Sequence, residues 1–586
     1  MCIRRVVFEK SPQHGGLLTY QIRVQCSCQS STSRTDVTGL LMRKMDKVYR
    51  ILLLLIIVTA VSCRRRSRTK KLTSKCVDYC DLVPDIRDLC PATPENTPPN
   101  RVNTTEKLRQ LRDVMKNTTL SGGVQLDAYL VYEASYYGGD VIGHDRRMRW
   151  ISGFSGSSGH VIVTAGYQEG IPNRAGLWTD GRYWLQADQE MDCNWILMKE
   201  GTTGTPSSVQ WLLDVLPIDA RVGADPNYID TTTWKEFEEA FAANGKNIQM
   251  VEVIPDLFDY IWTEEDGRPP IESNAIYVHD IEYAGKIWQE KLNDTRDDVS
   301  TKADVLIVSL LDDIAWLFNL RGSDRETSPL FDSVAMVEQD STRLYIRDPM
   351  SKIEAIKDHL NTGSDGSCSG ITGDCVEILD YNNYMRDIEQ YNSNPAISKI
   401  WINIGVSYAV YKAAGNPNAD KRYEDYSPIQ LKKSQKNPTE VRRYRERQIK
   451  DSAAVVEFAA FFEKEIQQGG YWTELSASAK LASFRSVDPD FRMLSFETIS
   501  AFGPNGAIIH YAPSNATDRQ ITTEDVYLVD SGGNYLDGTT DITRTFHFGT
   551  PSARHKVVTS IPELEHQYGR KVGIIITVQV MASDTS

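Results

Sequence analysis

Two aspartates, Asp530 and Asp541, are separated by ten residues in the C-terminal part of the chain. The apolar run Val526–Val529 predicts a buried strand that ends on Asp530, and Asp537-Gly538 is typical of a hairpin turn before a returning strand over Thr543–Phe548. Such a hairpin would hold the two carboxylates side by side. Because neighbouring carboxylates in an apolar setting repel each other unless a proton or a metal ion lies between them, the spacing indicates a metal site.

A pair of aspartates around a turn is more often a solvated turn than a metal site. Asp530, however, follows an apolar strand, where an unpaired charge is unfavourable. Carboxylate oxygens suit Mn²⁺, Mg²⁺ or Ca²⁺, and Zn²⁺ and Co²⁺ also accept them. Two ions that share such ligands could activate a bridging water.

A histidine lies upstream of this pair, in the segment Ser500–Pro513. Gly503, Pro504 and Gly506 predict a tight loop there, followed by a short apolar strand that ends at His510. An isolated histidine in this position is more often a structural hydrogen-bonding group than a catalyst.

Several long motifs resemble one family in collinear order. The sequence GPNGAIIHYAP, followed by VYLVDSGG and DGTTDITRTFHFGTP, resembles the catalytic domain of Xaa-Pro aminopeptidases (aminopeptidase P). The motif SGFSGSSG with WTDGRY at 178–183 is similar to the N-terminal domain of that family, and LDDIAWLFNLRGSD at 311–324 is similar to its middle domain. The match runs from about Thr105 to Ser552, and such a series is far more specific than one short pattern.

The resemblance implies the long, three-domain eukaryotic form of the family. Its fold class is α/β (α+β), with two creatinase-N-like mixed α/β domains followed by a pita-bread metallopeptidase domain. We expect these domains over 105–270, 271–436 and 437–586, after a Pro-, Asn- and Thr-rich linker over 64–104. The expected helices begin at Thr105, cover Ile281–Leu292 and run from Asn437 to Gly469-Gly470, and the expected strands include Ala128–Tyr132, His160–Thr164, Val305–Ser309 and Thr342–Ile346.

The resemblance also implies an activity and a site. Members of the family remove the N-terminal residue from peptides with proline in second position, using two Mn²⁺ ions held by two aspartates, one histidine and two glutamates. By motif match, Asp530 and Asp541 are the two aspartates, with Asp541 as the bridging ligand. His510 matches a histidine that holds substrate and stabilises the transition state, and Arg182 matches a substrate-contacting arginine, although it could equally be a surface arginine in a turn. Proline-containing peptides and a second copy of the chain are the implied partners.

The resemblance fades after Ser552, and the later histidine and glutamate motifs of the family are not found in the remaining sequence. Glu563, Glu565 and His566 are present there, but their spacing does not support a metal site. The sequence therefore predicts a C-terminally truncated catalytic domain that lacks three ligands. Two alternatives stay open: a catalytically inactive binding or regulatory homologue, and a proline dipeptidase-like enzyme, against which the middle-domain motif argues.

The segment Ile51–Val61 is the only long apolar run, and it is too short to span a bilayer comfortably. Basic residues precede it and Ala60 and Ser62 close it, which predicts a secretory signal peptide over 42–63 if translation begins at Met42 or Met45. Residues 1–41 are then a leader whose place in the protein is open. The alternatives are a signal anchor, which would retain the protein at a membrane, and a buried helix.

The sequons and the cysteines agree with secretion. Asn-x-Ser/Thr sequons begin at Asn103, Asn117, Asn293 and Asn515. The cysteines that follow the signal fit an oxidising compartment, where Cys368 and Cys375 could close a small loop; free thiols are the alternative.

The formal net charge of −14 argues against a general nucleic-acid binder, and the content of 41% apolar and 25% charged residues is that of a globular protein.

One prediction follows from the departure after Ser552. We expect that the 586-residue polypeptide does not cleave an Xaa-Pro peptide with added Mn²⁺, because two aspartates alone bind metal weakly. Release of the N-terminal amino acid measures this. Robust cleavage that the Asp541→Ala variant abolishes would contradict it.

Overall fold

The computed structural model describes residues 3–10, 20–26, 97–133, 141–166, 174–415 and 420–556. The chain divides into two compact units, Met1–Val77 and Asp78–Ser586. In the first unit, β1 (Ile3–Lys10) and β2 (Tyr20–Cys26) form an antiparallel hairpin. The signal segment over 42–63, most of the leader and of the linker, and residues 557–586 lie outside the described residues, so the corresponding expectations stay predictions. Within the described ranges, no helix is long and apolar enough to cross a membrane.

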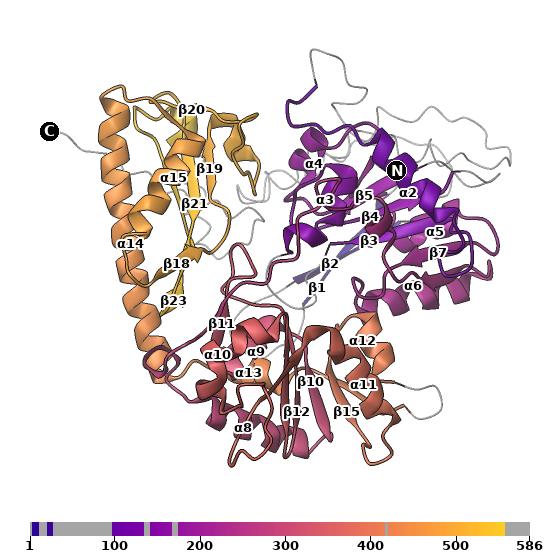
Figure 1. The fold of residues 1–586 in the computed structure, drawn as a ribbon. Helices are drawn as coiled ribbons and strands as arrows, with labels where there is room; N and C mark the ends of the chain where they lie inside the picture. Colours follow the sequence, from indigo (N-terminus) through magenta and orange to yellow (C-terminus); the bar gives the residue numbers. More distant parts are fainter. Residues whose placement is uncertain are drawn as a thin grey trace. The chain divides into compact units, whose positions relative to one another are not determined.

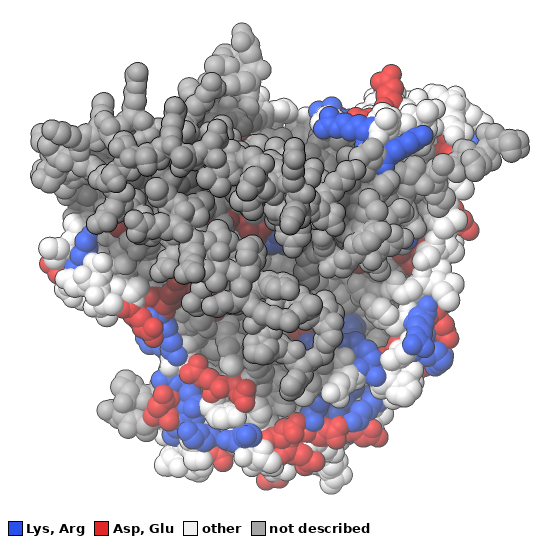
Figure 2. Space-filling model, turned by 180° about the vertical axis from the view of Figure 1, so that it is seen from behind, with Lys and Arg blue, Asp and Glu red and all other residues white. Residues whose placement is uncertain are grey.

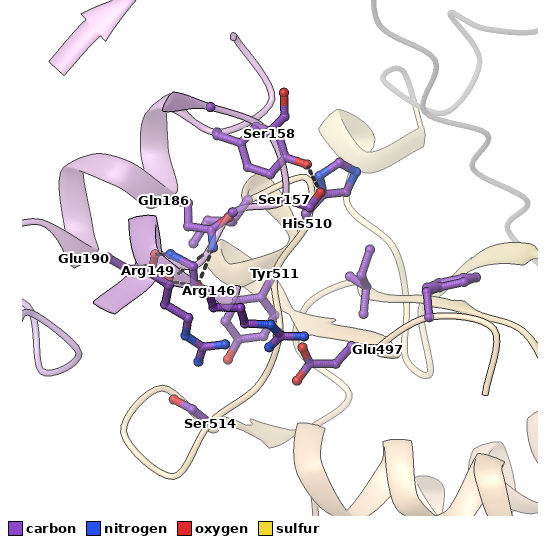
Figure 3. A pocket seen from close by; sticks show the side chains of 18 of the residues that line it. Arg146, Arg149, Ser157, Ser158, Gln186, Glu190, Glu497, His510, Tyr511 and Ser514 are labelled. Carbon is purple, nitrogen blue, oxygen red and sulfur yellow. Dashed lines mark hydrogen bonds between the residues drawn. The ribbon is translucent and has the colours of Figure 1, made fainter. Parts of the chain in front are cut away.

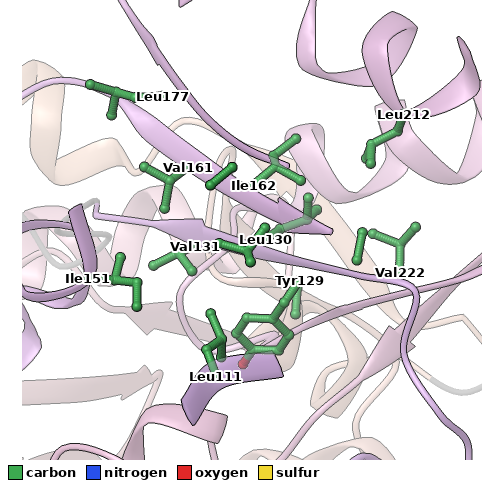
Figure 4. Packing of buried hydrophobic residues seen from close by; sticks show 14 of the residues in the cluster. Leu111, Tyr129, Leu130, Val131, Ile151, Val161, Ile162, Leu177, Leu212 and Val222 are labelled. Carbon is green, nitrogen blue, oxygen red and sulfur yellow. The ribbon is translucent and has the colours of Figure 1, made fainter. Parts of the chain in front are cut away.

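The second unit begins with a six-stranded mixed sheet in the order β6-β5-β4-β3-β7-β8 (Figure 1). Its strands are β3 (Ala128–Tyr132), β4 (His160–Thr164), β5 (Ala175–Thr179), β6 (Ile196–Lys199), β7 (Arg221–Ala224) and β8 (Gln249–Glu252). Its helices are α2 (Thr105–Met115), α3 (Arg147–Ser152), α4 (Trp184–Glu190), α5 (Ser208–Val215) and α6 (Thr231–Asn244). Figure 4 shows how strand side chains such as Leu130 and Ile162 pack with helix side chains such as Leu111 and Leu212, all of them buried.

A second six-stranded sheet follows in the order β14-β13-β12-β10-β15-β16. Its strands are β10 (Val305–Val308), β12 (Ser333–Glu338), β13 (Thr342–Ile346), β14 (Glu377–Asp380), β15 (Ile400–Asn403) and β16 (Arg422–Asp425). Its helices are α7 (Ile281–Ala284), α8 (Trp288–Ser300), α9 (Leu311–Leu317), α10 (Pro349–Leu360), α11 (Tyr384–Ser393), α12 (Tyr408–Ala413) and α13 (Pro428–Ser434), and β9 (Ile276–Val278) pairs separately with β11 (Leu320–Gly322).

The two large sheets have the same topology. In each, the first strand pairs antiparallel with the second and parallel with the fifth, and the remaining neighbours follow the same pattern. No internal repeat is evident in the sequence. The duplication is therefore one of strand order and direction.

The last region is built around a long helix, α14 (Pro438–Gln467), which Figure 1 draws beside small sheets. The sheet β19-β21-β24 consists of β19 (Ile499–Phe502), β21 (Tyr527–Ser531) and β24 (Ile542–Phe546). The sheet β18-β22-β23 consists of β18 (Phe491–Leu494), β22 (Gly533–Tyr535) and β23 (Gly538–Thr539). The helix α15 (Glu474–Arg485) and the pair β17 (Trp472–Thr473) and β20 (Gln520–Ile521) complete it.

Most of the expected elements are found where the sequence places them. The helix α2 buries Leu108, Leu111 and Met115 on one face, and β3, β4 and β13 have the expected bounds. The helix α14 starts with a capping box in which Asn437 and Glu440 satisfy each other's backbone N–H groups. These elements were predictable because their signals are local.

The expectation of one helix over Ile281–Leu292 is wrong. The segment folds as α7 and α8, and Gly285 ends α7 in the left-handed conformation with φ of 68°. A Cβ atom on Gly285 would lie 2.4 Å from Oδ1 of Asn437, the N-cap residue of α14. The break combines a local signal, the glycine itself, with a long-range contact to Asn437 that helical periodicity does not reveal.

Several surface features agree with the sequence. Cys368 and Cys375 form a disulfide, and Cys193 is also disulfide-bonded. The four sequon asparagines are exposed. Acidic and basic side chains alternate over the part of the face that Figure 2 colours, without a large basic patch.

Candidate functional site

The strand β21 carries Asp530 between two partners, β19 and β24. Asp530 is opposite Ile499 on one side and Thr543 on the other. Successive side chains of a strand point to opposite faces, so Tyr527 and Val529 enter the aromatic core around α14 while Asp530 faces the other side. Asp530 is half-buried as a result.

The connection between β21 and β24 brings Asp541 back to Asp530. Thr543 lies opposite Asp530 in the sheet, and Asp541 lies near enough to Asp530 for the two carboxylates to interact electrostatically. Burial, together with the neighbouring charge of Asp541, raises the pKa of Asp530. Its Oδ1 atom has no hydrogen-bond partner among the described residues. An unpaired, half-buried carboxylate oxygen beside a second carboxylate is suited to a cation.

The turn lies one residue earlier than the sequence indicates. Tyr535 pairs with Gly538, so Leu536 and Asp537 form the tight turn and Gly538 begins the returning strand. Gly532 permits a close approach at the base of the hairpin, because a Cβ atom there would lie 2.0 Å from the carbonyl oxygen of Thr540.

His510 contacts the N-terminal sheet region through one aromatic side chain. Its ring centroid lies 4.9 Å from that of Tyr183, which is fully buried and whose hydroxyl group is 2.7 Å from Oγ of Ser157. Burial and the positive charge of Arg182 lower the pKa of His510. Its Nδ1 atom is buried and has no hydrogen-bond partner within the described ranges. The lowered pKa favours the neutral imidazole over the charged one.

A buried glutamate that the sequence analysis missed supports the loop of His510. Glu474, which is fully buried, accepts hydrogen bonds from Nδ2 of Asn505, the hydroxyl group of Tyr511 and the backbone N–H of Arg519. Burial raises the pKa of Glu474 despite these donors. The only local signal is a glutamate in the first turn of a helix, which is too common to reveal this role.

A cavity of about 1480 Å³ joins these groups. Figure 3 shows side chains from two parts of the chain around it, with Ser157 and His510 drawn close together. The residues that line it include Arg146, Tyr183, Glu190, His510, Asp530 and Asp541. Three of the four candidate site residues therefore share one space.

Arg182 has a different position. Its guanidinium group forms an ion pair with Asp180, at 2.8 Å, and lies 5.1 Å from the ring centroid of Tyr183. Arg182 is half-exposed and is not among the residues that line the cavity. It acts on the site through its charge near His510, and a direct contact with substrate stays a prediction.

Three family models match the chain. The Creatinase/Prolidase N-terminal domain matches twice, over residues 107–257 and 267–440. Metallopeptidase family M24 matches residues 442–566. The cavity is therefore lined by residues from the first Creatinase/Prolidase match and from the metallopeptidase match.

Curated relatives agree with these models. An Xaa-Pro aminopeptidase of Drosophila melanogaster is 35% identical over 456 residues, which cover 78% of this chain and 70% of the relative. The chain belongs to the Xaa-Pro aminopeptidase family. Xaa-Pro aminopeptidase 2 of Homo sapiens is 37% identical over 477 residues, and that of Sus scrofa is 36% identical over the same length. The chain spans 66% of the length of these two mammalian relatives and 80% of it is covered by each match.

A solved Xaa-Pro aminopeptidase structure has the same fold. The X-prolyl aminopeptidase of Caenorhabditis elegans, described as an enzyme with a di-nuclear active site, is 29% identical with a TM-score of 0.70. The superposition covers 78% of this chain and 72% of the other. The predicted fold class, two creatinase-like mixed α/β domains followed by pita-bread metallopeptidase residues, is confirmed.

Membership of the Xaa-Pro aminopeptidase family implies metal ions. Asp530 and Asp541 fit this implication, because their oxygens are hard ligands and one of them lacks a protein partner. Within the described ranges, no group of three or more His, Cys, Asp and Glu side chains could hold a metal ion. Asp530 and Asp541 are therefore the two candidate ligands among the described residues, and Glu563, Glu565 and His566 lie outside those residues.

The close approach at Gly532 gives a test of the hairpin. We expect Gly532→Ala to lower the free energy of unfolding by about 1–3 kcal/mol, because the new methyl group would meet backbone atoms that cannot move aside. Chemical denaturation measures the loss. The control is Gly506→Ala in the loop before His510, where the nearest atom is 4.0 Å away. Equal stability of the two variants would contradict the prediction.

Proposed function

We propose that this protein recognises peptides that have proline in second position through the metal-dependent site of an Xaa-Pro aminopeptidase, and that cleavage requires ligands in addition to Asp530 and Asp541. The observation that carries the proposal is the shared cavity, in which the paired carboxylates of Asp530 and Asp541 and the free imidazole nitrogen of His510 lie together. Membership of the family supports the reaction type.

Proline in second position poses a specific chemical problem. The Xaa-Pro bond is a tertiary amide without an N–H group, and the ring fixes the φ angle of proline. A site for it needs a donor or acceptor aimed at the carbonyl and room for a ring. His510 and Tyr183, whose rings are adjacent, both line the cavity in which we place the peptide.

In this proposal Asp530 and Asp541 would contribute two of the five ligands of the Mn²⁺ ions, which supply Lewis-acid chemistry when bound. Oxygen ligands favour Mn²⁺ or Mg²⁺ over softer ions. His510 binds the peptide carbonyl and stabilises charge that develops on it. Glu474 keeps the histidine loop in place through Asn505 and Tyr511.

Binding of two tripeptides tests the proposal. With Mn²⁺ present, we expect the full chain to bind Gly-Pro-Ala about tenfold more tightly than Gly-Ala-Ala, because the proposed function requires a preference for proline in second position. Calorimetry measures both affinities. Asp541→Ala or chelation of the metal should remove the metal-dependent part of the affinity. His510→Ala should weaken binding of Gly-Pro-Ala, whereas His547→Ala, outside the cavity, should not.

Equal affinity for the two tripeptides would overturn the proposal. Cleavage of the Gly-Pro bond that Asp541→Ala abolishes supports the peptidase. Selective binding of Gly-Pro-Ala without cleavage supports the inactive binding homologue instead.

We also propose that the protein enters the secretory pathway. The apolar segment Ile51–Val61, the four exposed sequon asparagines and the disulfide between Cys368 and Cys375 support this. After expression of the full chain in a secreting eukaryotic cell, we expect a fall in mass on treatment with an N-glycosidase. The fall should be smaller in an Asn515→Gln variant, and an unchanged mass of the original protein would contradict the proposal.

A further inference from the structure

Two arginines are buried beneath the hairpin that joins Asp530 to Asp541. Arg447, on α14, has a side chain that is 1% exposed, and it forms ion pairs with Asp537, Asp488 and Asp490. Arg485, on α15, is fully buried and pairs with Asp451. Neither arginine is among the residues that line the cavity.

Arg447 holds the tip of the hairpin. Its Nε atom donates to Asp537, a fully buried carboxylate in the tight turn, while its other nitrogens donate to Asp488 at 2.6 Å and to Asp490 at 3.0 Å. The guanidinium group also lies 4.0 Å from the ring centroid of Tyr535 in β22. One side chain thus joins the turn to the helix and to the segment before β18.

Arg485 holds the base of the same hairpin. Its Nε atom donates to Asp451 at 2.7 Å, and Asp451 also accepts a hydrogen bond of 2.6 Å from the hydroxyl group of Tyr535. A further nitrogen donates at 3.5 Å to the carbonyl oxygen of Ser531, the residue after Asp530. The two arginines therefore contact the segment between Asp530 and Asp541 at Ser531, Tyr535 and Asp537.

Stability alone explains such a network poorly. Taking charges out of water costs several kcal/mol per ion, and a buried ion pair often contributes no more than well-packed apolar residues would. A fixed set of ion pairs does define one geometry, because the planar guanidinium fork requires its partners at set angles. The hairpin must in turn keep two like-charged carboxylates near each other in the cavity.

We propose that Arg447 and Arg485 are positioning residues that fix the separation of Asp530 and Asp541 for divalent-cation binding. They act through Tyr535, Asp537 and the backbone at Ser531, and they touch neither the cation nor the peptide. This inference rests on the proposed function, since it takes the aspartate pair to be the cation site.

The test combines hydrogen exchange and Mn²⁺ affinity in the full chain. Arg447→Lys keeps the charge and loses the fork. We expect it to weaken Mn²⁺ binding by about 10- to 100-fold, as loss of groups that orient metal ligands does. Without metal, we expect amide exchange over residues 531–541 to become at least about tenfold faster, because Gly533 and Thr540 lose the support for their mutual hydrogen bonds.

The matched control is Arg296→Lys in α8. Arg296 is 8% exposed and pairs with Asp374 at 2.7 Å, and neither residue lines the cavity. This variant should change neither exchange in 531–541 nor Mn²⁺ affinity. Tyr535→Phe, which removes only the hydroxyl group that donates to Asp451, should act in the same direction as Arg447→Lys and serves if that variant does not fold.

The outcomes distinguish a failure of the positioning role from a failure of the proposed function. Unchanged Mn²⁺ affinity in Arg447→Lys and Tyr535→Phe, or an equal loss in Arg296→Lys, overturns the inference alone. Absence of Mn²⁺ binding in the unmodified chain overturns the proposed function and this inference with it.

Discussion

The proximity of the like-charged carboxylates of Asp530 and Asp541 in one cavity is the constraint on which this region depends. Two negative charges at that separation repel each other, and burial of one of them adds to the cost. The strand register opposite Thr543, the glycine at 532 and the buried arginine pairs all hold the chain against this repulsion. A bound cation would relieve it, which is why the local structure is informative about chemistry even without the ion.

The site is assembled from segments that are far apart in the sequence. His510 belongs to the metallopeptidase region, whereas Tyr183 and Ser157 belong to the first creatinase-like sheet region. The packing of one ring against the other closes a wall of the cavity that neither region forms alone. The creatinase-like region therefore contributes directly to the pocket.

The two large sheets show how little of a topology is visible in a sequence. Their strand order and directions are the same, yet no repeat of residues accompanies them. A buried strand requires only apolar, often β-branched residues, and many unrelated sequences satisfy that requirement. Duplicated architecture can therefore persist where residue identities do not show it.

The sequence by itself determined the local elements and the chemistry-bearing residue types. The apolar periodicity of α2, the capping box at Asn437 and the spacing of Asp530 and Asp541 are all local signals. Only the tertiary structure decided the packing of Asn437 against Gly285 and the support of His510 by Glu474, because each depends on a side chain or backbone atom that is distant along the chain. Residue type and spacing specify what a group can do, and long-range packing specifies what it meets.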